Sequence, residues 1–517
     1  MNLVKAGATI GGLTMVSRVL GFARDMIASR ILGASHSNDA FNLAFLLPNI
    51  FRRLFAEGAF SSGFVPLFSR RLASGGHEDA ERFSNEILAV FMPALLLVTV
   101  LFEIAMPAVI ALVAAGYGDT PGKQELATEL TRWTFPYLLF ISLVALLSGV
   151  LNSLTRFAIA AFAPALLNVA LIVALLVAPE GDIAVVRSMA IAVLVGGILQ
   201  FALCWFAVRR AGVRLHFGRP RMTPAVRELL ILILPATAAA GVYQISQLFY
   251  GYFSTLLGEG ALTMLSYADR LNQLPLSIIG TALGVAILPS ISQAIARDNQ
   301  AEAADVQARA FDLSMLLTLP ATLALAVAAV PIIGALFQGG EYTVEAARTT
   351  GNILAILVTG LPAYVLVKVL TPGFYARKDV KTPVLIAMAV LLASIPANFI
   401  LIPQIGIYSL ATVTSAGAWI NFLTLFAISY SRRQFRPPAW LFNRVLRQLL
   451  AALAMAGALY FLRELLGDFF LGNAIERAFG LAALVGAGAA VYFGVAFLIG
   501  GVDREALATL RRRRKQA

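Results

Sequence analysis

The stretch Ser17-Arg-Val-Leu-Gly-Phe-Ala-Arg-Asp25 places two arginines inside an otherwise apolar segment. The fold has to keep these charged side chains away from lipid. Six cations share such a setting: Arg18, Arg24, Arg52, Arg53, Arg270 and Lys368. An arginine at the centre of a bilayer costs about 2.5–3.5 kcal/mol on insertion scales. Six lipid-facing cations would therefore cost more than the net stability of a typical domain. We expect most of them to face a hydrated interior, which favours a negatively charged cargo.

The composition is that of an integral membrane protein. Of the 517 residues, 59% are hydrophobic and only 13% are charged, against about 25% charged in soluble domains. The single cysteine, Cys204, excludes an internal disulfide framework, and the three histidines are too far apart in sequence for metal-ligand spacing. The apolar stretch after Lys5 is too long for a cleaved signal peptide. We predict no cofactor and no metal.

Apolar stretches long enough to span a bilayer, which takes roughly 20 residues, recur along the whole chain. We predict fourteen spanning helices, at residues 4–30, 37–64, 83–114, 124–152, 160–178, 185–208, 226–257, 262–294, 309–337, 347–374, 383–401, 405–430, 441–465 and 476–500. Charges interrupt the first, second and eighth of these ranges. The predicted fold class is an all-α polytopic membrane protein.

The distribution of basic residues predicts the orientation. With both termini in the cytoplasm, 27 lysines and arginines fall on the cytoplasmic side and 7 on the opposite side, and the six intramembrane cations complete the 40. Basic residues accumulate in cytoplasmic loops, so this asymmetry supports fourteen spans. It also explains the net charge of +12 without a nucleic-acid partner. The basic tail 511–515 needs no role beyond holding anionic headgroups.

A faint internal repeat has an offset of roughly 220 residues. Thr134-Phe-Pro-Tyr leads to Leu151-Asn-Ser-Leu-Thr-Arg156, and Gly360-Leu-Pro-Ala-Tyr364 leads to Pro372-Gly-Phe-Tyr-Ala-Arg377. An even number of helices per repeat gives parallel repeats related by an axis along the membrane normal. We therefore expect two six-helix lobes related by a pseudo-twofold axis, residues 1–215 and 216–435. The remaining residues, 436–517, hold two extra helices and the basic tail.

The charged segments suggest which cations could share a chamber. Arg18 and Arg24 lie about 120° apart around one helix, so both can border the same cavity. Arg53 and Glu57 form an i,i+4 pair that can be purely structural, which leaves Arg52 as the freer cation. Asp25 and Asp269 can be simple counter-ions of the neighbouring arginines instead of functional acids. Lys368 can extend its ammonium group to the membrane interface instead of facing a cavity. Pro48 and Pro275 lie beside the buried charges, so we interpret them as candidate hinges rather than ordinary packing positions.

Arginine suits a phosphate because its planar fork donates two parallel hydrogen bonds and stays charged. A diphosphate has enough oxygens to engage three or four such groups at once. Gly11-Gly12 and Gly196-Gly197 lack the lysine and the spacing of a phosphate-binding nucleotide loop. No catalytic triad or cysteine nucleophile stands out either. The pattern favours a transporter over an enzyme.

Several motifs resemble the MurJ (MviN) family of lipid II flippases. They are Ser17-Arg-Val-Leu-Gly-Phe-Ala-Arg-Asp25, Asp39-Ala-Phe, Leu47-Pro-Asn-Ile-Phe-Arg-Arg-Leu-Phe-Ala-Glu-Gly-Ala-Phe60, Phe64-Val-Pro66, Tyr267-Ala-Asp-Arg-Leu271 and Pro372-Gly-Phe-Tyr-Ala-Arg377. The resemblance implies the fold of the MOP exporter superfamily. It implies a monomer in the bacterial inner membrane that moves lipid II, the undecaprenyl-diphosphate-linked peptidoglycan precursor, to the outer leaflet, among membrane lipids and with no nucleic acid.

The resemblance also implies a set of site residues. By resemblance, the cavity arginines are Arg18, Arg24, Arg52 and Arg270, and Asp39 and Glu57 are functional acids. The charged segments themselves add Ser17, Asn49 and Arg53 as substrate-binding candidates and Asp25 and Asp269 as functional acids. The two C-terminal helices are implied to form a groove for the lipid tail. One departure is Gln273, where enterobacterial relatives carry an acid, and the interior of 226–257 lacks the carboxylate of a sodium site. The coupling ion therefore stays open.

Three other functions remain as alternatives. A flippase for another lipid-linked oligosaccharide, of the O-antigen type, would share the fold and the diphosphate. A cation-coupled drug exporter of the MATE kind would have about twelve helices and an acidic cavity. A membrane scaffold without transport would not need arginines inside its spans.

Overall fold

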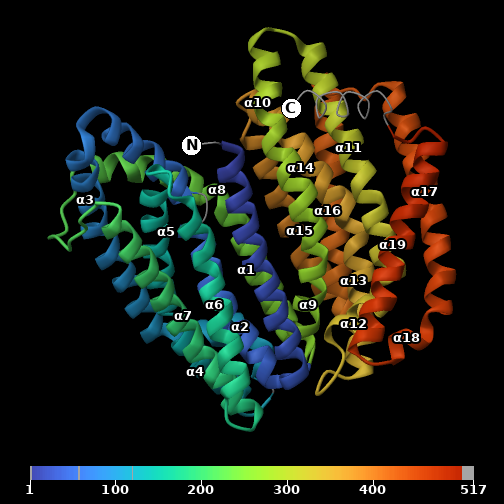
Figure 1. Ribbon diagram of the computed structural model, residues 1–517, viewed down its shortest axis with the longest axis horizontal. Helices are drawn as coiled ribbons and strands as arrows, with labels where there is room; N and C mark the ends of the chain where they lie inside the picture. Colours follow the sequence, from blue (N-terminus) through green and yellow to red (C-terminus); the bar gives the residue numbers. More distant parts are fainter. Residues whose placement is uncertain (1–2, 56–58, 119, 503–517) are drawn as a thin grey trace. The chain divides into compact units, whose positions relative to one another are not determined.

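The computed structural model describes residues 3–55, 59–118 and 120–502, and nearly all of them are helical (Figure 1). Within these ranges the one β-contact is an isolated bridge between Gly339 and Tyr342. In the described part of the chain, ten helices are long and apolar enough to cross a membrane. The chain is therefore a multi-pass, all-α membrane protein, as the sequence predicts.

Contacts divide the chain into two compact units. The first is Met1–Thr263 with Gly339–Tyr342, and the second is Met264–Gln338 with Thr343–Ala517. The elements of the first unit are α1 (Leu3–Leu32), α2 (His36–Phe55), α3 (Ala59–Val113), the 3₁₀ turn η1 (Ala115–Tyr117), α4 (Lys123–Thr134), α5 (Tyr137–Ser153), α6 (Phe157–Val177), α7 (Asp182–Arg210) and α8 (Pro224–Thr255).

The second unit contains the remaining helices. They are α9 (Ala261–Pro275, which begins in the first unit), the π-helix η2 (Leu276–Gly280), α10 (Thr281–Ala296), α11 (Gln300–Val327), α12 (Ala329–Phe337), α13 (Val344–Leu357), the 3₁₀ turn η3 (Val358–Gly360), α14 (Leu361–Ala376), α15 (Lys381–Ile405), α16 (Tyr408–Ser431), α17 (Ala439–Leu465), α18 (Gly467–Leu471) and α19 (Ala474–Leu498).

Every one of the fourteen predicted ranges is helical over most of its described length. Among the described residues, ten of these ranges correspond to helices that meet the length and hydropathy expected of a span. The count of fourteen crossings therefore stays a prediction. So do the lobe boundaries at 215/216 and 435/436; α8, which the first boundary gives to the second lobe, packs against α2 and α3 in the first unit.

Two predicted spans are broken helices. The range 124–152 is divided at Pro136, between α4 and α5, and the range 347–374 is divided at η3, just before Pro362. Proline cannot donate a backbone hydrogen bond, so it ends or bends a helix unless it lies in the first turn. Both breaks fall in the two copies of the repeat motif. Helix α3 is also bent: its 55 residues would extend about 82 Å if straight, and Gly76 interrupts them with φ +70°.

Left-handed turns recur with the same offset as the repeat. Residues with positive φ pair as Gly33 with Gly258, Gly76 with Asp298, Gly122 with Gly340, Thr155 with Lys378, Gly181 with Gly406, and Gly212 with Arg433. The pair at Thr155 and Lys378 also shares its hydrogen bonding, because Arg156 N donates to Leu151 O and Asp379 N donates to Phe374 O. These bonds close the helix end in a Schellman turn. The matched turns support an internal repeat, whereas the twofold axis stays a prediction.

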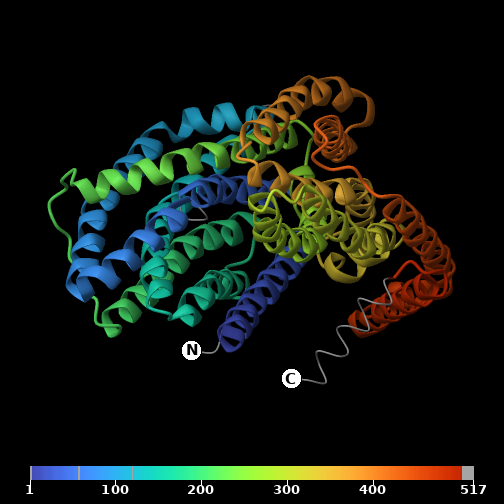
Figure 2. The ribbon, with the colours of Figure 1, turned by 90° about the horizontal axis from the view of Figure 1, so that it is seen from above.

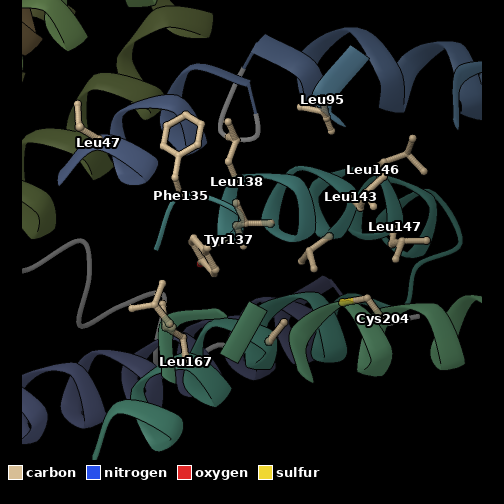
Figure 3. Packing of buried hydrophobic residues seen from close by; sticks show 14 of the residues in the cluster. Leu47, Leu95, Phe135, Tyr137, Leu138, Leu143, Leu146, Leu147, Leu167 and Cys204 are labelled. Carbon is tan, nitrogen blue, oxygen red and sulfur yellow. The ribbon is translucent and has the colours of Figure 1, made fainter. Parts of the chain in front are cut away.

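The core of the first unit lies among α2, α3, α5, α6 and α7. Figure 3 shows Phe135, Tyr137 and Leu147 of the α4–α5 region between Leu95 on one side and Leu167 and Cys204 on the other. These side chains are almost completely buried. Tight packing of this kind makes the unit a rigid support for the charged residues at its edge.

Of the two C-terminal helices, α17 packs on α11, and α19 packs on α17 and α12 (Figure 2). A buried polar contact joins them to the rest of the second unit: Arg444 of α17 pairs with Asp312 of α11 at 3.0 Å, and Gln448 Nε2 donates to the other carboxylate oxygen at 2.7 Å. The hydroxyl of Tyr492 in α19 donates to Leu316 O at 2.7 Å. These bonds attach both helices to α11 in addition to their apolar packing.

Candidate functional site

The sequence-predicted site residues lie on three helices. Helix α1 carries Ser17, Arg18, Arg24 and Asp25; helix α2 carries Asp39, Pro48, Asn49, Arg52 and Arg53; and helix α9 carries Asp269, Arg270 and Pro275. The residues of α1 and α2 belong to the first unit, and Asp269, Arg270 and Pro275 belong to the second. Glu57 lies outside the described residues.

Arg24 is buried and paired. Its Nε and Nη2 atoms donate to Asp25 Oδ1 at 3.0 and 2.6 Å, and Nη1 donates to Asn168 Oδ1 at 3.1 Å. Asp25 is thus the counter-ion that its position next to Arg24 suggested. The pair is formally neutral, so Arg24 does not contribute an isolated positive charge to this face of α1.

The contacts with Asp25 and Asn168 do not use all the N–H donors of the Arg24 guanidinium. A guanidinium has five N–H donors, and the contacts with described residues use one on each nitrogen. The second N–H of Nη1 and that of Nη2 are not used in these contacts. N–H groups on the terminal nitrogens of a guanidinium are the donors that bind phosphate oxygens.

Arg18 and Arg52 lie in more open surroundings. Arg18 is exposed on α1, between the exposed side chains of Met15 and Val19. Arg52 is half-buried, and its Nε donates to Asn49 Oδ1 at 3.2 Å, while Asn49 Nδ2 donates to Phe45 O at 2.8 Å. Asn49 therefore holds one edge of the Arg52 guanidinium. Arg53 is also half-buried.

Pro48 lies in the middle of α2 and is buried. Because proline has no N–H, the carbonyl of Ala44 loses its usual intrahelical partner. The hydroxyl of Thr134, at the end of α4, donates to that carbonyl at 2.8 Å. The break in the α2 ladder is thus filled by the neighbouring helix, as is typical of proline inside membrane proteins.

Asp39 is the most completely bonded charged residue described in the first unit. Its side chain is 1% exposed and pairs with Lys123 Nζ at 3.2 Å. Its Oδ2 also accepts a bond from Gly260 N at 2.8 Å, and Oδ1 accepts from the Thr263 amide at 3.0 Å and the Thr263 hydroxyl at 2.9 Å. The carboxylate thereby joins the start of α2 to α4 and to the start of α9.

Sequence reasoning missed Lys123, which it placed among the basic residues of an outer loop. Its Nζ lies 4.0 Å from the centre of the Tyr117 ring, and its side chain is 4% exposed. A single lysine beside a short loop gives no local signal that it reaches an acid 84 residues away. Gly260 had no signal either, although its φ of +72° and the 2.4 Å that would separate an added Cβ from Ala34 O require glycine there.

The predicted residues of α9 lie at its C-terminal half. Arg270 is exposed, and Asp269 is half-buried and accepts a bond from Gln273 Nε2 at 2.7 Å. Pro275 ends α9, and a π-helical turn from Leu276 to Gly280 follows directly. π-Helical turns are often found at functional sites. Lys368 of α14 is half-buried, and its side chain packs closely against Gly280. A Cβ added to Gly280 would lie 2.9 Å from Lys368 Cδ.

Comparison with known proteins gives a consistent match. The family model described as "Lipid II flippase MurJ" matches residues 28–480. A "Probable lipid II flippase MurJ" of Rhizobium meliloti is 42% identical over 510 residues, which cover 97% of this chain and 95% of that protein. The "Lipid II flippase MurJ" of Burkholderia cenocepacia is 36% identical over 509 residues, covering 97% and 98%.

Solved structures agree with this match. The structure of "Lipid II flippase MurJ, inward closed conformation" superposes with a TM-score of 0.78 at 26% identity, covering 95% of this chain and 98% of that one. An inward-facing MATE transporter of the MOP superfamily has a TM-score of 0.67 at 16% identity, covering 82% and 97%, and shares the fold alone. The resemblance found in the sequence motifs is confirmed: this chain belongs to the MurJ family of lipid II flippases.

Proposed function

We propose that this chain moves lipid II from the cytoplasmic to the outer leaflet of the bacterial inner membrane by alternating access, as a transporter and not an enzyme. The observation that carries the substrate class is the match to lipid II flippases over nearly the whole chain. The diphosphate and sugars of lipid II are too polar to cross hydrocarbon unaided. A hydrated, cationic chamber replaces water around the head while the tail stays in lipid.

The diphosphate is held by Arg18, Arg24, Arg52 and Arg270 in this proposal. One N–H group on each terminal nitrogen of Arg24 is not used in the contacts with Asp25 and Asn168 and can bind phosphate oxygens, and the exposed side chains of Arg18 and Arg270 add charge. Asn49 orients Arg52. Ser17 and Arg53 line the same chamber, and the acids Asp25 and Asp269 limit its net charge. Asp39 and Glu57 are the further functional acids of this proposal.

The membrane topology in this proposal has fourteen crossings with both termini in the cytoplasm. The 27 to 7 distribution of basic residues supports it, as do the matched turns of the two repeats. Two six-helix lobes then rock about the site, with Pro48 and the π-helical turn after Pro275 as the flexible points of α2 and α9.

Helices α17 and α19 form the groove for the lipid tail in this proposal. Both expose large apolar side chains, among them Phe461 at 75%, Leu465 at 78% and Phe493 at 49%. In a membrane protein, such surfaces can contact the hydrocarbon chains of lipids. The polar contact of Arg444 and Gln448 with Asp312 ties α17 to α11, so the tail surface stays attached to the second unit.

The experiment is complementation of a bacterial strain depleted of its own lipid II flippase. The wild-type chain should restore growth, and Arg24→Ala and Arg270→Ala should each fail to do so while reaching the membrane at normal levels. Exposed Arg348→Ala, on the predicted outer surface, is the matched control and should complement fully. Full rescue by both Arg24→Ala and Arg270→Ala would contradict the arginine site.

A flippase for another lipid-linked oligosaccharide is the second candidate, because a diphosphate would engage the same arginines. The family match favours lipid II. The MATE-like drug exporter shares the fold, but the cations in the spans of this chain suit an anion. Growth rescue of a strain depleted of its O-antigen flippase, without rescue of the lipid II flippase, would favour the second candidate.

A further inference from the structure

Asn168 of α6 is a buried amide that contacts α1 at two points. Its Oδ1 accepts from Arg24 Nη1 at 3.1 Å, and its Nδ2 donates to Ser17 O at 3.1 Å. A longer contact of 3.5 Å joins Nδ2 to Pro164 O in its own helix. Both ends of the amide are therefore bonded, and its orientation is fixed by the helix backbone on one side and by a guanidinium on the other.

The amide complements Asp25 around Arg24. Asp25 binds the Nε and Nη2 side of the guanidinium, and Asn168 binds one N–H of Nη1 on the other side. Held on both sides, the planar group cannot rotate about its terminal bonds without breaking one contact. These contacts do not use the second N–H group of each terminal nitrogen, and such groups are donors for phosphate oxygens.

The chemistry of an amide fits this position better than that of an acid. A second carboxylate at residue 168 would also hold Nη1, but it would give the Arg24 site a net negative charge. Asparagine supplies the acceptor without a charge. An apolar residue of similar size would leave the Nη1 N–H and the side of the guanidinium without support in a buried setting, which is costly for a charged group.

We propose that Asn168 is the positioning residue for Arg24: it fixes the guanidinium so that its two terminal N–H groups point at the diphosphate of the cargo. This inference rests on the proposed function, because it takes Arg24 as a diphosphate ligand. Asn168 itself does not touch the cargo. Its proposed effect on diphosphate binding passes through the Arg24 guanidinium, whereas its bond to Ser17 O anchors the amide to the backbone of α1.

A double-mutant cycle on lipid II binding tests this inference. Equilibrium binding of lipid II is measured with the purified full chain in lipid nanodiscs for the wild type, Asn168→Leu, Arg24→Ala and the double variant. Asn168→Leu should weaken binding about tenfold, or about 1.4 kcal/mol, as expected for the loss of a hydrogen bond to a charged group. In the Arg24→Ala background it should weaken binding less than twofold, because the group that it positions is gone.

Gln200→Leu is the matched control. Gln200 is another fully buried amide of the first unit; its Nε2 donates to Ala163 O in α6 at 3.1 Å and its Oε1 accepts from the Tyr137 hydroxyl at 3.4 Å. It has no contact with Arg24 among those described. Gln200→Leu should lower the unfolding temperature and leave the lipid II affinity of the folded protein unchanged. Asn168→Asp, which keeps the size and the acceptor, serves if Asn168→Leu does not fold, and it should weaken binding at least tenfold.

The outcomes separate this inference from the proposed function. Wild-type affinity in Asn168→Leu or in Asn168→Asp, or an equal loss from Asn168→Leu with and without Arg24, would overturn the positioning role while Arg24 remains a ligand. Wild-type affinity in Arg24→Ala would instead overturn the proposed diphosphate site, and the positioning role with it.

Discussion

At the scale of the residue, the contacts of buried charged side chains show what the sequence could and could not predict. The sequence predicted that Asp25 lies beside Arg24, because neighbours in sequence must be close in space, and this contact is present at 2.6 Å. It could not predict that Asn168 or Lys123 would complete the environments of Arg24 and Asp39, because both partners come from distant parts of the chain. Only the packing of α6 and α4 brings these side chains to α1 and α2.

The ion pair of Asp39 and Lys123 gives a prediction about stability. Lys123→Met leaves the buried carboxylate without its cation, which typically costs about 3–5 kcal/mol. We expect a clearly lower unfolding temperature for the purified protein, whereas Lys381→Met, at an exposed position, should have little effect. Adding Asp39→Asn to Lys123→Met should recover part of the loss. An unchanged unfolding temperature in Lys123→Met would contradict the pairing.

The fork of Arg24 gives a prediction about chemistry. Arg24→Lys keeps the charge but replaces a planar group that binds Asp25 and Asn168 simultaneously by a single ammonium. We expect a loss of lipid II affinity of about tenfold, with normal membrane insertion. The measurement is equilibrium binding in nanodiscs. If Arg24→Lys bound like the wild type, charge alone would account for this position.

At the scale of the element, the turns that end helices recur at matched positions in the two copies of the repeat. The motif copies at Thr134 and Gly360 predicted related segments, and the structure adds that both copies break a helix and later end one in the same left-handed turn. Sequence could identify the glycine turns from composition. It could not identify the turns at Thr155, Asp298, Lys378 and Arg433, because these residues rarely adopt positive φ.

Thr155 provides the test at this scale. A β-branched residue at φ +60° is strained by about 1 kcal/mol, and glycine removes the strain. Thr155→Gly should therefore raise the unfolding temperature. Gly76→Ala should lower it, because Gly76 has φ +70° and a Cβ added there would meet open space, so the cost is conformational. Thermal unfolding of both variants checks the prediction, and a stabilised Gly76→Ala would contradict it.

The pattern of spans is what the sequence predicted best for the whole molecule. Each of the fourteen ranges found from length and hydropathy is helical over most of its described length, because a bilayer requires long apolar helices whatever their packing. The same reasoning could not locate the packing of α8, which joins α2 and α3 in the first unit. Hydropathy specifies which segments enter the membrane, and side-chain contacts specify which neighbours they meet.

The orientation of the molecule can be measured by cysteine labelling, since the single native cysteine, Cys204, is buried. In a Cys204→Ala background, Glu180→Cys should react with a membrane-impermeant thiol reagent in intact spheroplasts. Arg219→Cys should react only after the membrane is opened, because the basic loop 209–221 belongs on the cytoplasmic side. Both parent positions are exposed. Reversed labelling would contradict cytoplasmic termini.

Transport of lipid II by the purified chain in liposomes tests the central claim most directly. Accessibility of lipid II to an external enzyme would be followed for the wild type, Arg24→Ala and Arg270→Ala, with an O-antigen precursor as the competing cargo. The account predicts that the wild type moves lipid II in preference to the O-antigen precursor, and that each arginine variant loses this movement. Equal movement by the wild type and both variants would contradict a site built from these arginines.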